Sequence, residues 1–313
     1  MFSHNLVFCS KIAGHSQEIN SICFAPKRKL LASASKDKTI KIWSLKTEKA
    51  VNTTVFESDY ANYVTFNPDN TLLVSGEKDG TIKAWSLQNK KLSFTLKGHK
   101  RKVNSVTIHP QGKLLASASE DKKVKLWSLE SRQLVYTLTG HQDNVLSTVF
   151  SPKGDILASS GDGNDKTIKL WFLAENRNIT LKGHSDWFGG IYSVAFSPDS
   201  KLVASGSKDK TIKIWRVDTG EEIMTLTGHN DYVTSIAISP DGKILASGSK
   251  DKTLKLWTLA TGELISTINR NAPIWTVAFS PNNKILATGC EQGNISLFNP
   301  KLESPNLLQD LLV

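Results

Sequence analysis

The sequence predicts an all-β fold made of seven copies of one four-stranded antiparallel unit, and three repeated features carry this prediction. An aspartate stands six residues before each of six regularly spaced tryptophans, and a Gly-His pair precedes five of the units. The tryptophans recur every 42 or 44 residues, with Phe298 in the seventh place: Trp43, Trp85, Trp127, Trp171, Trp215 and Trp257. A repeat of this length indicates one supersecondary unit stacked many times in a single architecture.

Each unit has the pattern of four short strands joined by tight turns. In the first unit, residues 19–24 and 39–44 alternate apolar with polar or small residues, and residues 30–35 form another apolar run. Residues 92–96 show the pattern of a fourth strand in the second unit. Turns such as 67–70 place proline where a φ of about −65° suits a type I turn. Each unit is therefore expected to be an antiparallel meander.

The order Gly-His, then Leu-Ala-Ser, then Asp-x-Thr-x-Lys-x-Trp resembles the WD40 repeat, and the resemblance covers roughly residues 5–300. It implies a seven-bladed WD40 β-propeller in which each unit is one blade. It also implies a hydrogen-bonded His, Ser, Asp and Trp tetrad in five blades. The sets are His15/Ser33/Asp37/Trp43, His99/Ser117/Asp121/Trp127, His141/Ser159/Asp165/Trp171, His184/Ser205/Asp209/Trp215 and His229/Ser247/Asp251/Trp257. By the same spacing, blade 2 keeps Ser75, Asp79 and Trp85 with Glu57 in place of histidine, and blade 7 keeps Thr288.

The N-terminal segment is expected to close the ring. Residues 6–12 resemble the fourth strand of other units, whereas the seventh unit ends after its third strand at Phe298. Pairing these segments completes blade 7 and removes two open sheet edges, which predicts a single propeller domain over residues 1–300. The expected parts are the closing strand 1–13, repeats at about 14–56, 57–97, 98–139, 140–182, 183–227, 228–268 and 269–300, and a C-terminal tail at 301–313. Leucines at one-turn spacing in the tail favour a short helix patching the propeller over a partner-recruiting motif.

Composition bounds the remaining possibilities. The chain has 313 residues, 39% of them hydrophobic, and a formal net charge of +10, which predicts a folded core. No apolar run approaches the 18 or so residues that span a bilayer, and no export signal is apparent, so we expect a cytoplasmic protein. The cysteines Cys9, Cys23 and Cys290 are odd in number and lack CxxC spacing. We interpret them as buried free thiols, and expect neither a disulfide framework nor a thiolate zinc site.

The sequence offers no convincing catalytic, metal or cofactor site. Ser, His and Asp recur together as in a hydrolase triad, but five equivalent copies tied to tryptophan favour a structural role. Glu57 near Asp79 could form an acid/base pair, although Glu57 pointing to water is the favoured interpretation. Residues 162–165, a two-residue insertion in blade 4, hint at a cation loop but lack EF-hand spacing, which favours a longer hairpin. No nucleotide-binding glycine motif is present.

The positive charge comes from the repeat. Fifteen lysines occupy three fixed positions around the repeated aspartate, so they are expected to be distributed around the ring. Strand-edge lysines also discourage edge-to-edge aggregation. We therefore expect weak, salt-sensitive attraction to polyanions and no specific nucleic-acid ligand. Binding of nucleic acid or acidic protein through this lysine-rich rim is the alternative function.

Aromatic residues outside the tetrads point to a partner. In WD40 proteins the segment after the histidine lies on the top face near the central channel, where partners usually bind. The residues singled out there are Trp187, Phe188, Tyr192, Tyr232, Trp275 and Tyr60, with Lys208, Lys250 and Arg270 as basic neighbours. Aromatic anchors beside cations are typical of interface hot spots, although the rings could instead only pack loops. The favoured function is a non-catalytic scaffold, monomeric and outside the membrane, that binds a protein or peptide, with an acidic one favoured.

Overall fold

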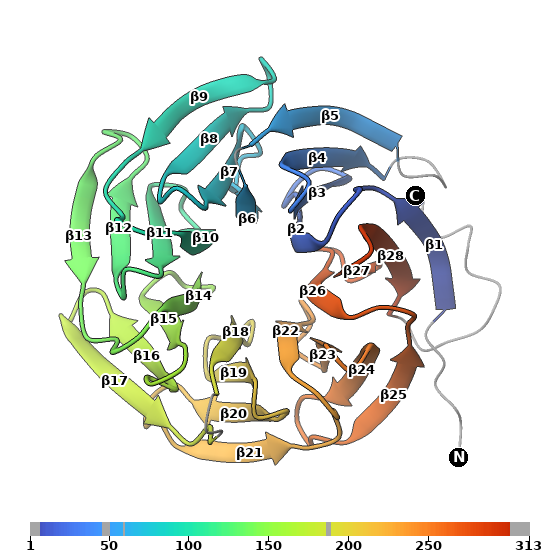
Figure 1. The fold of residues 1–313 in the computed structure, drawn as a ribbon. Helices are drawn as coiled ribbons and strands as arrows, with labels where there is room; N and C mark the ends of the chain where they lie inside the picture. Colours follow the sequence, from blue (N-terminus) through green and yellow to red (C-terminus); the bar gives the residue numbers. More distant parts are fainter. Residues whose placement is uncertain (1–6, 46–50, 59, 186–188, 301–313) are drawn as a thin grey trace.

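The computed structural model describes residues 7–45, 51–58, 60–185 and 189–300, which form seven four-stranded antiparallel sheets around a central axis (Figure 1). No helix occurs in these residues. The predicted all-β, seven-bladed propeller is confirmed. The first blade has the strand order β2-β3-β4-β5, and the next five blades repeat this order along the chain.

The strands form four concentric layers (Figure 1). The innermost are β2 (Ile19–Phe24), β6 (Ala61–Phe66), β10 (Val103–Ile108), β14 (Val145–Phe150), β18 (Ile191–Phe196), β22 (Val233–Ile238) and β26 (Ile274–Phe279). Next are β3 (Leu30–Ser35), β7 (Leu72–Glu77), β11 (Leu114–Ser119), β15 (Ile156–Gly161), β19 (Leu202–Ser207), β23 (Ile244–Ser249) and β27 (Leu286–Cys290). The third layer is β4 (Thr39–Ser44), β8 (Ile82–Ser86), β12 (Val124–Ser128), β16 (Thr167–Phe172), β20 (Ile212–Arg216), β24 (Thr253–Thr258) and β28 (Asn294–Asn299). The outermost are β5 (Val51–Glu57), β9 (Lys91–Leu96), β13 (Leu134–Leu138), β17 (Arg177–Lys182), β21 (Glu222–Leu226), β25 (Leu264–Asn269) and β1 (Val7–Ala13).

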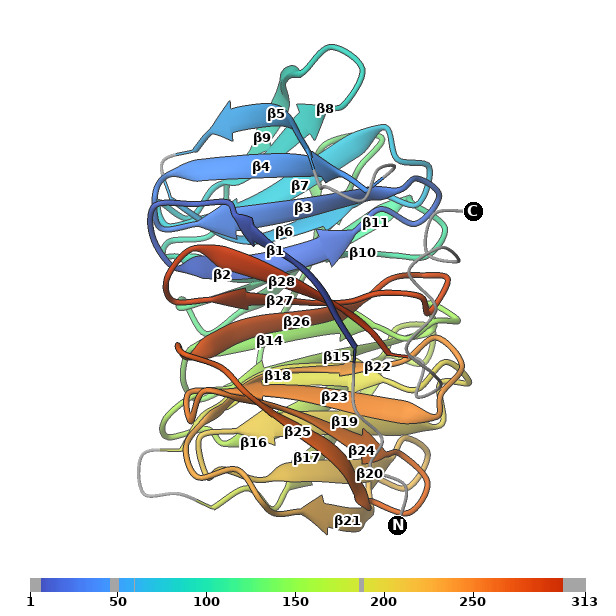
Figure 2. The same cartoon turned by 90° about the vertical axis from the view of Figure 1, so that its right-hand side faces the viewer.

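The N-terminal strand closes the ring. The seventh sheet has the order β1-β28-β27-β26, so β1 forms the outer strand of the last blade (Figure 2). Phe8 pairs with Phe298, and Ile12 pairs with Ile295. The predicted closing strand is confirmed, although it begins and ends one residue later than the expected 6–12. The predicted tail, 301–313, lies outside the described residues.

The hydrophobic core lies between the blades. Buried residues form seven clusters, and each cluster draws its members from two adjacent blades. At the closure, Ile12 and Leu297 of blade 7 pack with Leu31 and Trp43 of blade 1. Because each blade buries its faces only against its neighbours, the ring must close for every blade to be covered.

Candidate functional site

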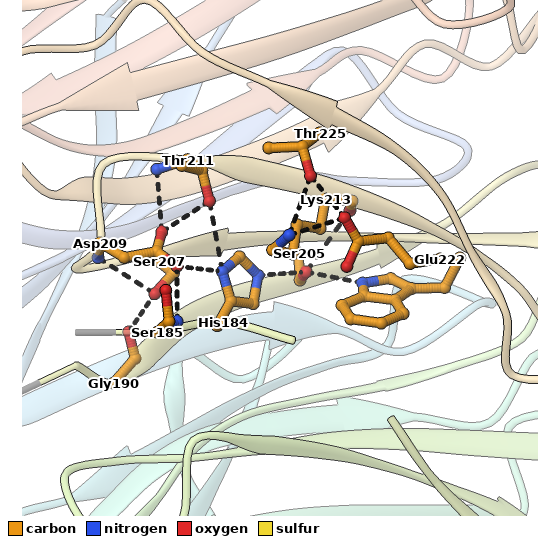
Figure 3. A network of polar contacts seen from close by, with 11 residues as sticks. His184, Ser185, Gly190, Ser205, Ser207, Asp209, Thr211, Lys213, Glu222 and Thr225 are labelled. Carbon is orange, nitrogen blue, oxygen red and sulfur yellow. Dashed lines mark hydrogen bonds and ion pairs between the residues drawn. The ribbon is translucent and has the colours of Figure 1, made fainter. Parts of the chain in front are cut away.

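The predicted tetrad residues lie together in five blades. In each, the histidine Nδ1 lies 2.8 or 2.9 Å from the aspartate Oδ2 and the histidine Nε2 lies 2.7 Å from the serine Oγ. The tryptophan Nε1 donates to the same serine Oγ at 2.8 to 2.9 Å. Figure 3 shows this network around His184 in blade 5. The aspartate accepts from Nδ1–H, so Nε2 accepts from the serine hydroxyl, and the chain is satisfied at every step.

The aspartates are held as carboxylates. Burial would raise the pKa of Asp165, but hydrogen bonds and charge attraction from His141 and the Thr167 hydroxyl outweigh it and lower that pKa to about 2. The same opposing causes also lower the pKa values of the other four tetrad aspartates, Asp37, Asp121, Asp209 and Asp251. Burial also lowers the pKa of His15, against the opposing charge of Asp37.

The five tetrad serines differ from the other predicted site residues in having no exposed surface. Each is 0% exposed: Ser33, Ser117, Ser159, Ser205 and Ser247. A residue that no solvent reaches cannot contact a substrate or a partner, so these five serines, expected in the structural tetrads, form no part of a binding surface. They belong to the interior of their blades, because the second strand that carries each serine is covered by the strands on either side of it.

The tetrads accordingly do not have the arrangement of a hydrolase site. In blade 1, Ser33 Oγ already accepts from Trp43 Nε1 at 2.9 Å and bonds to His15 Nε2 at 2.7 Å. A nucleophile must reach its substrate, and these hydroxyls are closed off by the blade itself. The arrangement instead staples the third strand of each blade to the loop before its first strand.

Blade 2 is stapled by a residue that the sequence pattern did not reveal. Glu77 is fully buried and accepts from Ser75 Oγ and from Ser58 Oγ, each at 2.5 Å, while Trp85 Nε1 donates to Ser75 Oγ at 3.1 Å. Asp79, expected in a tetrad, instead accepts from Thr81 at the surface. The sequence did hold a clue to the role of Glu77, because a glutamate there departs from the repeat. Blades 1, 3, 5 and 6 have serine at the equivalent position: Ser35, Ser119, Ser207 and Ser249.

The placement of Glu57 at the histidine position was wrong. Glu57 is exposed and pairs with Thr39 as the last residue of β5. Strand pairing links Ser44 to Val51 in blade 1 but Ser86 to Lys91 in blade 2, so the blade 1 hairpin is two residues longer. Measured from equivalent paired residues, the segment between the outer strand of blade 1 and the first strand of blade 2 is two residues shorter than its counterpart in the next blade. The two changes cancel, so the tryptophan spacing stays at 42 and the sequence does not show that the histidine position has moved.

Every innermost strand carries a β-bulge near its start. The register shifts between the first and third residues of all seven strands, for example between Ile19 and Ser21. The residues left out of the pairing are Asn20, Asn62, Asn104, Leu146, Tyr192, Thr234 and Trp275. Bulges re-aim side chains, and here they place one residue per blade at the start of the innermost layer.

The small polar residues at these bulges join neighbouring blades. Asn20 Nδ2 donates to the Ala61 carbonyl at 3.1 Å, and Asn62 and Asn104 make the equivalent bonds to the next blades. Tyr192 and Trp275 stand in the same positions with large rings. The Trp275 Nε1 is buried and has no hydrogen-bond partner among the described residues. The bulge positions are therefore polar in blades 1 to 3 and aromatic in blades 5 and 7.

Two predicted tyrosines and two predicted lysines gather at the mouth between blades 5 and 6, and we call Tyr192, Tyr232, Lys208 and Lys250 the tyrosine–lysine cluster. The tyrosine rings stack with centroids 6.2 Å apart. Each lysine Nζ lies 5.1 Å from the Tyr232 centroid. Burial, with smaller effects of Asp162, Tyr232 and Asp231, raises the pKa of Tyr192 to about 12, so its hydroxyl remains a hydrogen-bond donor near neutral pH.

The other predicted rim residues are distributed more widely. Lys78 Nζ lies 5.4 Å from the Tyr60 ring in blade 2. Arg270 turns to blade 7, where its guanidinium lies 5.5 Å from the rings of both Phe8 and Phe298. Trp187 and Phe188 lie outside the described residues.

The insertion in blade 4 forms a connection between β15 and β16. The Asn164 amide donates to Asp143 Oδ2 at 3.0 Å, which ties the connection to the loop before β14. Within the described ranges, no group of three or more His, Cys, Asp or Glu side chains is placed to hold a metal ion. Cys9, Cys23 and Cys290 carry thiols outside any disulfide, as expected, but they are only half-buried.

Comparison with known proteins agrees with the fold. A family model described as WDR3 second beta-propeller domain matches residues 18–305. In the part of the chain that the structure describes, no helix is long and apolar enough to cross a membrane.

Similar segments occur in functionally diverse relatives. An uncharacterized WD repeat-containing protein of Nostoc is 40% identical over 58 residues, 18% of this chain and 4% of that protein. Nuclear distribution protein PAC1 of Gibberella zeae is 40% identical over 75 residues, covering 23% of this chain and 16% of PAC1. Small ribosomal subunit protein RACK1 of Drosophila melanogaster is 38% identical over 74 residues, covering 23% of this chain and 22% of RACK1. These alignments thus cover less than a quarter of each relative.

Proposed function

Because this chain belongs to the family of the WDR3 second beta-propeller domain, a WD-repeat propeller, we propose that it is a non-catalytic scaffold that binds an acidic segment of a partner protein. WD-repeat propellers are generally protein-interaction scaffolds. The binding surface in this proposal is the tyrosine–lysine cluster, and one observation carries it: two ammonium groups lie 5.1 Å from the Tyr232 ring centroid, and no carboxylate of the described residues pairs with either.

Two other lysines of the rim pair with carboxylates, whereas Lys78 in blade 2 has no carboxylate within 4 Å among the described residues. In blade 1, Lys36 Nζ lies 2.5 Å from Glu18 Oε2, and in blade 3, Lys102 Nζ lies 4.0 Å from Glu120 Oε1. Among the described residues, no carboxylate lies within 4 Å of the Lys208 or Lys250 ammonium group. Lys208 and Lys250 therefore bring two cations without a carboxylate partner in the described chain to one aromatic ring, whereas Lys78 brings one to Tyr60.

The chemistry of the cluster suits an acidic peptide. Each ammonium group has three N–H donors, and a cation–π contact worth about 0.5–1 kcal/mol at an exposed site leaves these donors available. A carboxylate between Lys208 and Lys250 would bond to both, while the stacked tyrosines would cover an adjacent apolar group. Rigid aromatic rings beside cations are the usual composition of an interface hot spot. Tyr60 and Trp275 would extend the contact around the mouth.

Affinity capture from native lysate tests the proposal. The double variant Lys208→Gln/Lys250→Gln and the variant Tyr232→Ala should each recover far less of a specific partner than the wild type. A matched double control, Lys123→Gln/Tyr136→Ala, changes exposed residues of blade 3 and should leave recovery unchanged. The captured partner's binding segment is then made as two synthetic peptides, one native and one with Gln and Asn replacing Glu and Asp. Equal binding of both peptides, or equal recovery by all variants, would contradict the proposal.

Polyanion binding by the lysine-rich rim is the alternative, and the structure offers it limited support. Lysines four residues after the aspartate donate across the outer strand pair in four blades: Lys125 to Thr137, Lys169 to Thr180, Lys213 to Thr225 and Lys255 to Thr267. These ammonium groups are partly occupied within their own blades. Retention on heparin that survives about 0.3 M salt and persists in Lys208→Gln/Lys250→Gln would favour this alternative.

A further inference from the structure

Blade 7 lacks the side chains that fill the tetrad region of other blades. Arg270 stands near the histidine position, Gln292 replaces aspartate, and Phe298 replaces tryptophan. Phe298 is 1% exposed but has no N–H to offer, so Thr288 at the serine position receives no bond from it. The polar chain of His, Ser, Asp and Trp that staples blades 1 and 3 to 6 is therefore not formed here.

The altered side chains leave a cavity of about 170 Å³. Arg270 and Lys11 line it together with hydroxyl and amide groups, among them Thr288, Ser296, Gln292 and Asn294. Its volume far exceeds the 10–15 Å³ or so needed for one water, and it is smaller than the roughly 300–1,000 Å³ of pockets for drug-sized ligands. The cavity therefore suits a small polar group.

The position of the cations differs from that in the other blades. In blades 2 to 6 a third-strand lysine faces a fourth-strand threonine, as in the pair Lys255 and Thr267. In blade 7 the third strand has Ser296 and the closing strand has Lys11 opposite it. Ser296 Oγ accepts from Arg270 Nη2 at 2.8 Å. The hydroxyl that would otherwise pair with lysine is thus bonded to Arg270, and a second cation, Lys11, lines the same cavity.

The Arg270 guanidinium has no anionic partner in the part of the chain that the structure describes. It lies over Phe8 and Phe298, and among the described residues no carboxylate lies within 4 Å of it. No Asp or Glu of the described chain lines the cavity. A guanidinium has five N–H donors, and the bond to Ser296 uses one. Two cations with several neutral hydrogen-bonding groups and no acid form an anion site.

We propose that the blade 7 cavity binds a phosphate group, either as inorganic phosphate or at the end of a small phosphomonoester. A tetrahedral oxyanion presents more acceptor oxygens than a carboxylate does, which matches the number of donors around the cavity. Arg270 holds the anion through its free N–H groups, and Lys11 supplies the second charge. This site is separate from the tyrosine–lysine cluster, which belongs to blades 5 and 6, because it is formed by blade 7 and the closing strand.

Isothermal titration calorimetry of the full chain tests the site, with inorganic phosphate and glycerol phosphate as probes and sodium chloride at matched ionic strength as the blank. The wild type should bind phosphate saturably at one site. Arg270→Gln should weaken binding by about tenfold or more, and Lys11→Gln by severalfold. Lys123→Gln, an exposed lysine of blade 3, should bind as the wild type does.

The two probes distinguish the sources of the phosphate group. Binding of both shows that a phosphomonoester can enter, and binding of inorganic phosphate alone shows that the free ion is the ligand; either result supports the site. No saturable binding, or equal affinity in wild type and Arg270→Gln, would overturn it. If Arg270→Gln does not fold by circular dichroism, the exposed Lys11→Gln decides, and unchanged affinity in that variant overturns the proposal.

Discussion

The Ile22 amide donates a hydrogen bond to the Thr276 hydroxyl at 3.2 Å, joining blades 1 and 7 across 254 positions of the chain. Equivalent bonds link other neighbours, for example from the Val64 amide to Ser21 Oγ and from the Ile236 amide to Ser193 Oγ. The closing interface thus uses the same hydroxyl-to-amide contact as the interfaces formed along the chain. The first and last blades are therefore expected to unfold together.

Ile12→Ala should lower the free energy of unfolding by about 2–4 kcal/mol, because Ile12 is 8% exposed and packs in the closing interface. Leu92→Ala on the outer strand of blade 2 is the control and should cost less than about 1 kcal/mol, since Leu92 is 47% exposed. Equilibrium urea unfolding measures both. Equal destabilisation by the two variants would show that β1 does not carry the closure.

Glu77→Ala should destabilise the protein by about 2–4 kcal/mol, because the buried hydroxyls of Ser58 and Ser75 lose their acceptor. Ser58→Ala in the Glu77→Ala background should then cost less than it does alone, with a coupling of about 1 kcal/mol or more. Urea unfolding of the four proteins in this cycle measures the coupling. Glu57→Ala, at an exposed carboxylate, should change stability by less than about 0.5 kcal/mol. If the effects of Glu77→Ala and Ser58→Ala on the free energy of unfolding were additive, Glu77 would not act as the staple of blade 2.

Stability should fall in acid through the tetrad aspartates. The folded pKa of Asp165 is about 2, below its ordinary value of 3.8. Its carboxylate therefore stabilises the fold in full at pH values above 3.8. This contribution, about 2 kcal/mol, is lost as the pH falls from about 4 toward 2. Asp165→Asn should therefore be less stable than the wild type at pH 7, and the difference should narrow below about pH 4. Urea unfolding at a series of pH values checks this, and parallel stability curves would contradict it.

The turn after each repeated aspartate requires a left-handed residue. Lys252 adopts a φ of 66° there, whereas Gly80 has a φ of 87° at the equivalent place in blade 2. Lys252→Gly should raise the free energy of unfolding by up to about 1 kcal/mol, because glycine adopts this conformation without strain.

Gly80→Ala should lower the free energy of unfolding, the opposite of the effect expected for Lys252→Gly. A Cβ at Gly80 would lie 2.9 Å from the carbonyl oxygens of both Arg101 and His99, so the loss should exceed about 1 kcal/mol. Thermal unfolding of the two variants checks the pair. Changes of the same sign would show that the turn conformation does not control stability here.

The sequence predicted most of the fold because the repeat is encoded locally. Strands predicted at 19–24, 30–35 and 39–44 are observed with those bounds. Tyr192 and Tyr232 were singled out because they depart from the repeat, and Lys208 and Lys250 because the repeat places a lysine beside them; the structure brings the four side chains together. The histidine position of blade 2 was missed because an insertion and a deletion cancel within one repeat length.

By itself, the sequence determined the number of blades, the strands within each blade and the identity of five staples, since turn residues, alternation and the spacing of Trp and Asp act over short distances. Only the tertiary structure decided how Glu77 replaces a histidine, which rim lysines lack an acid, and that Arg270 faces a cavity beside Lys11. These relationships join side chains from different strands, and for Lys11 from the opposite end of the chain. Their distances depend on how the ring closes, which spacing along the sequence does not specify.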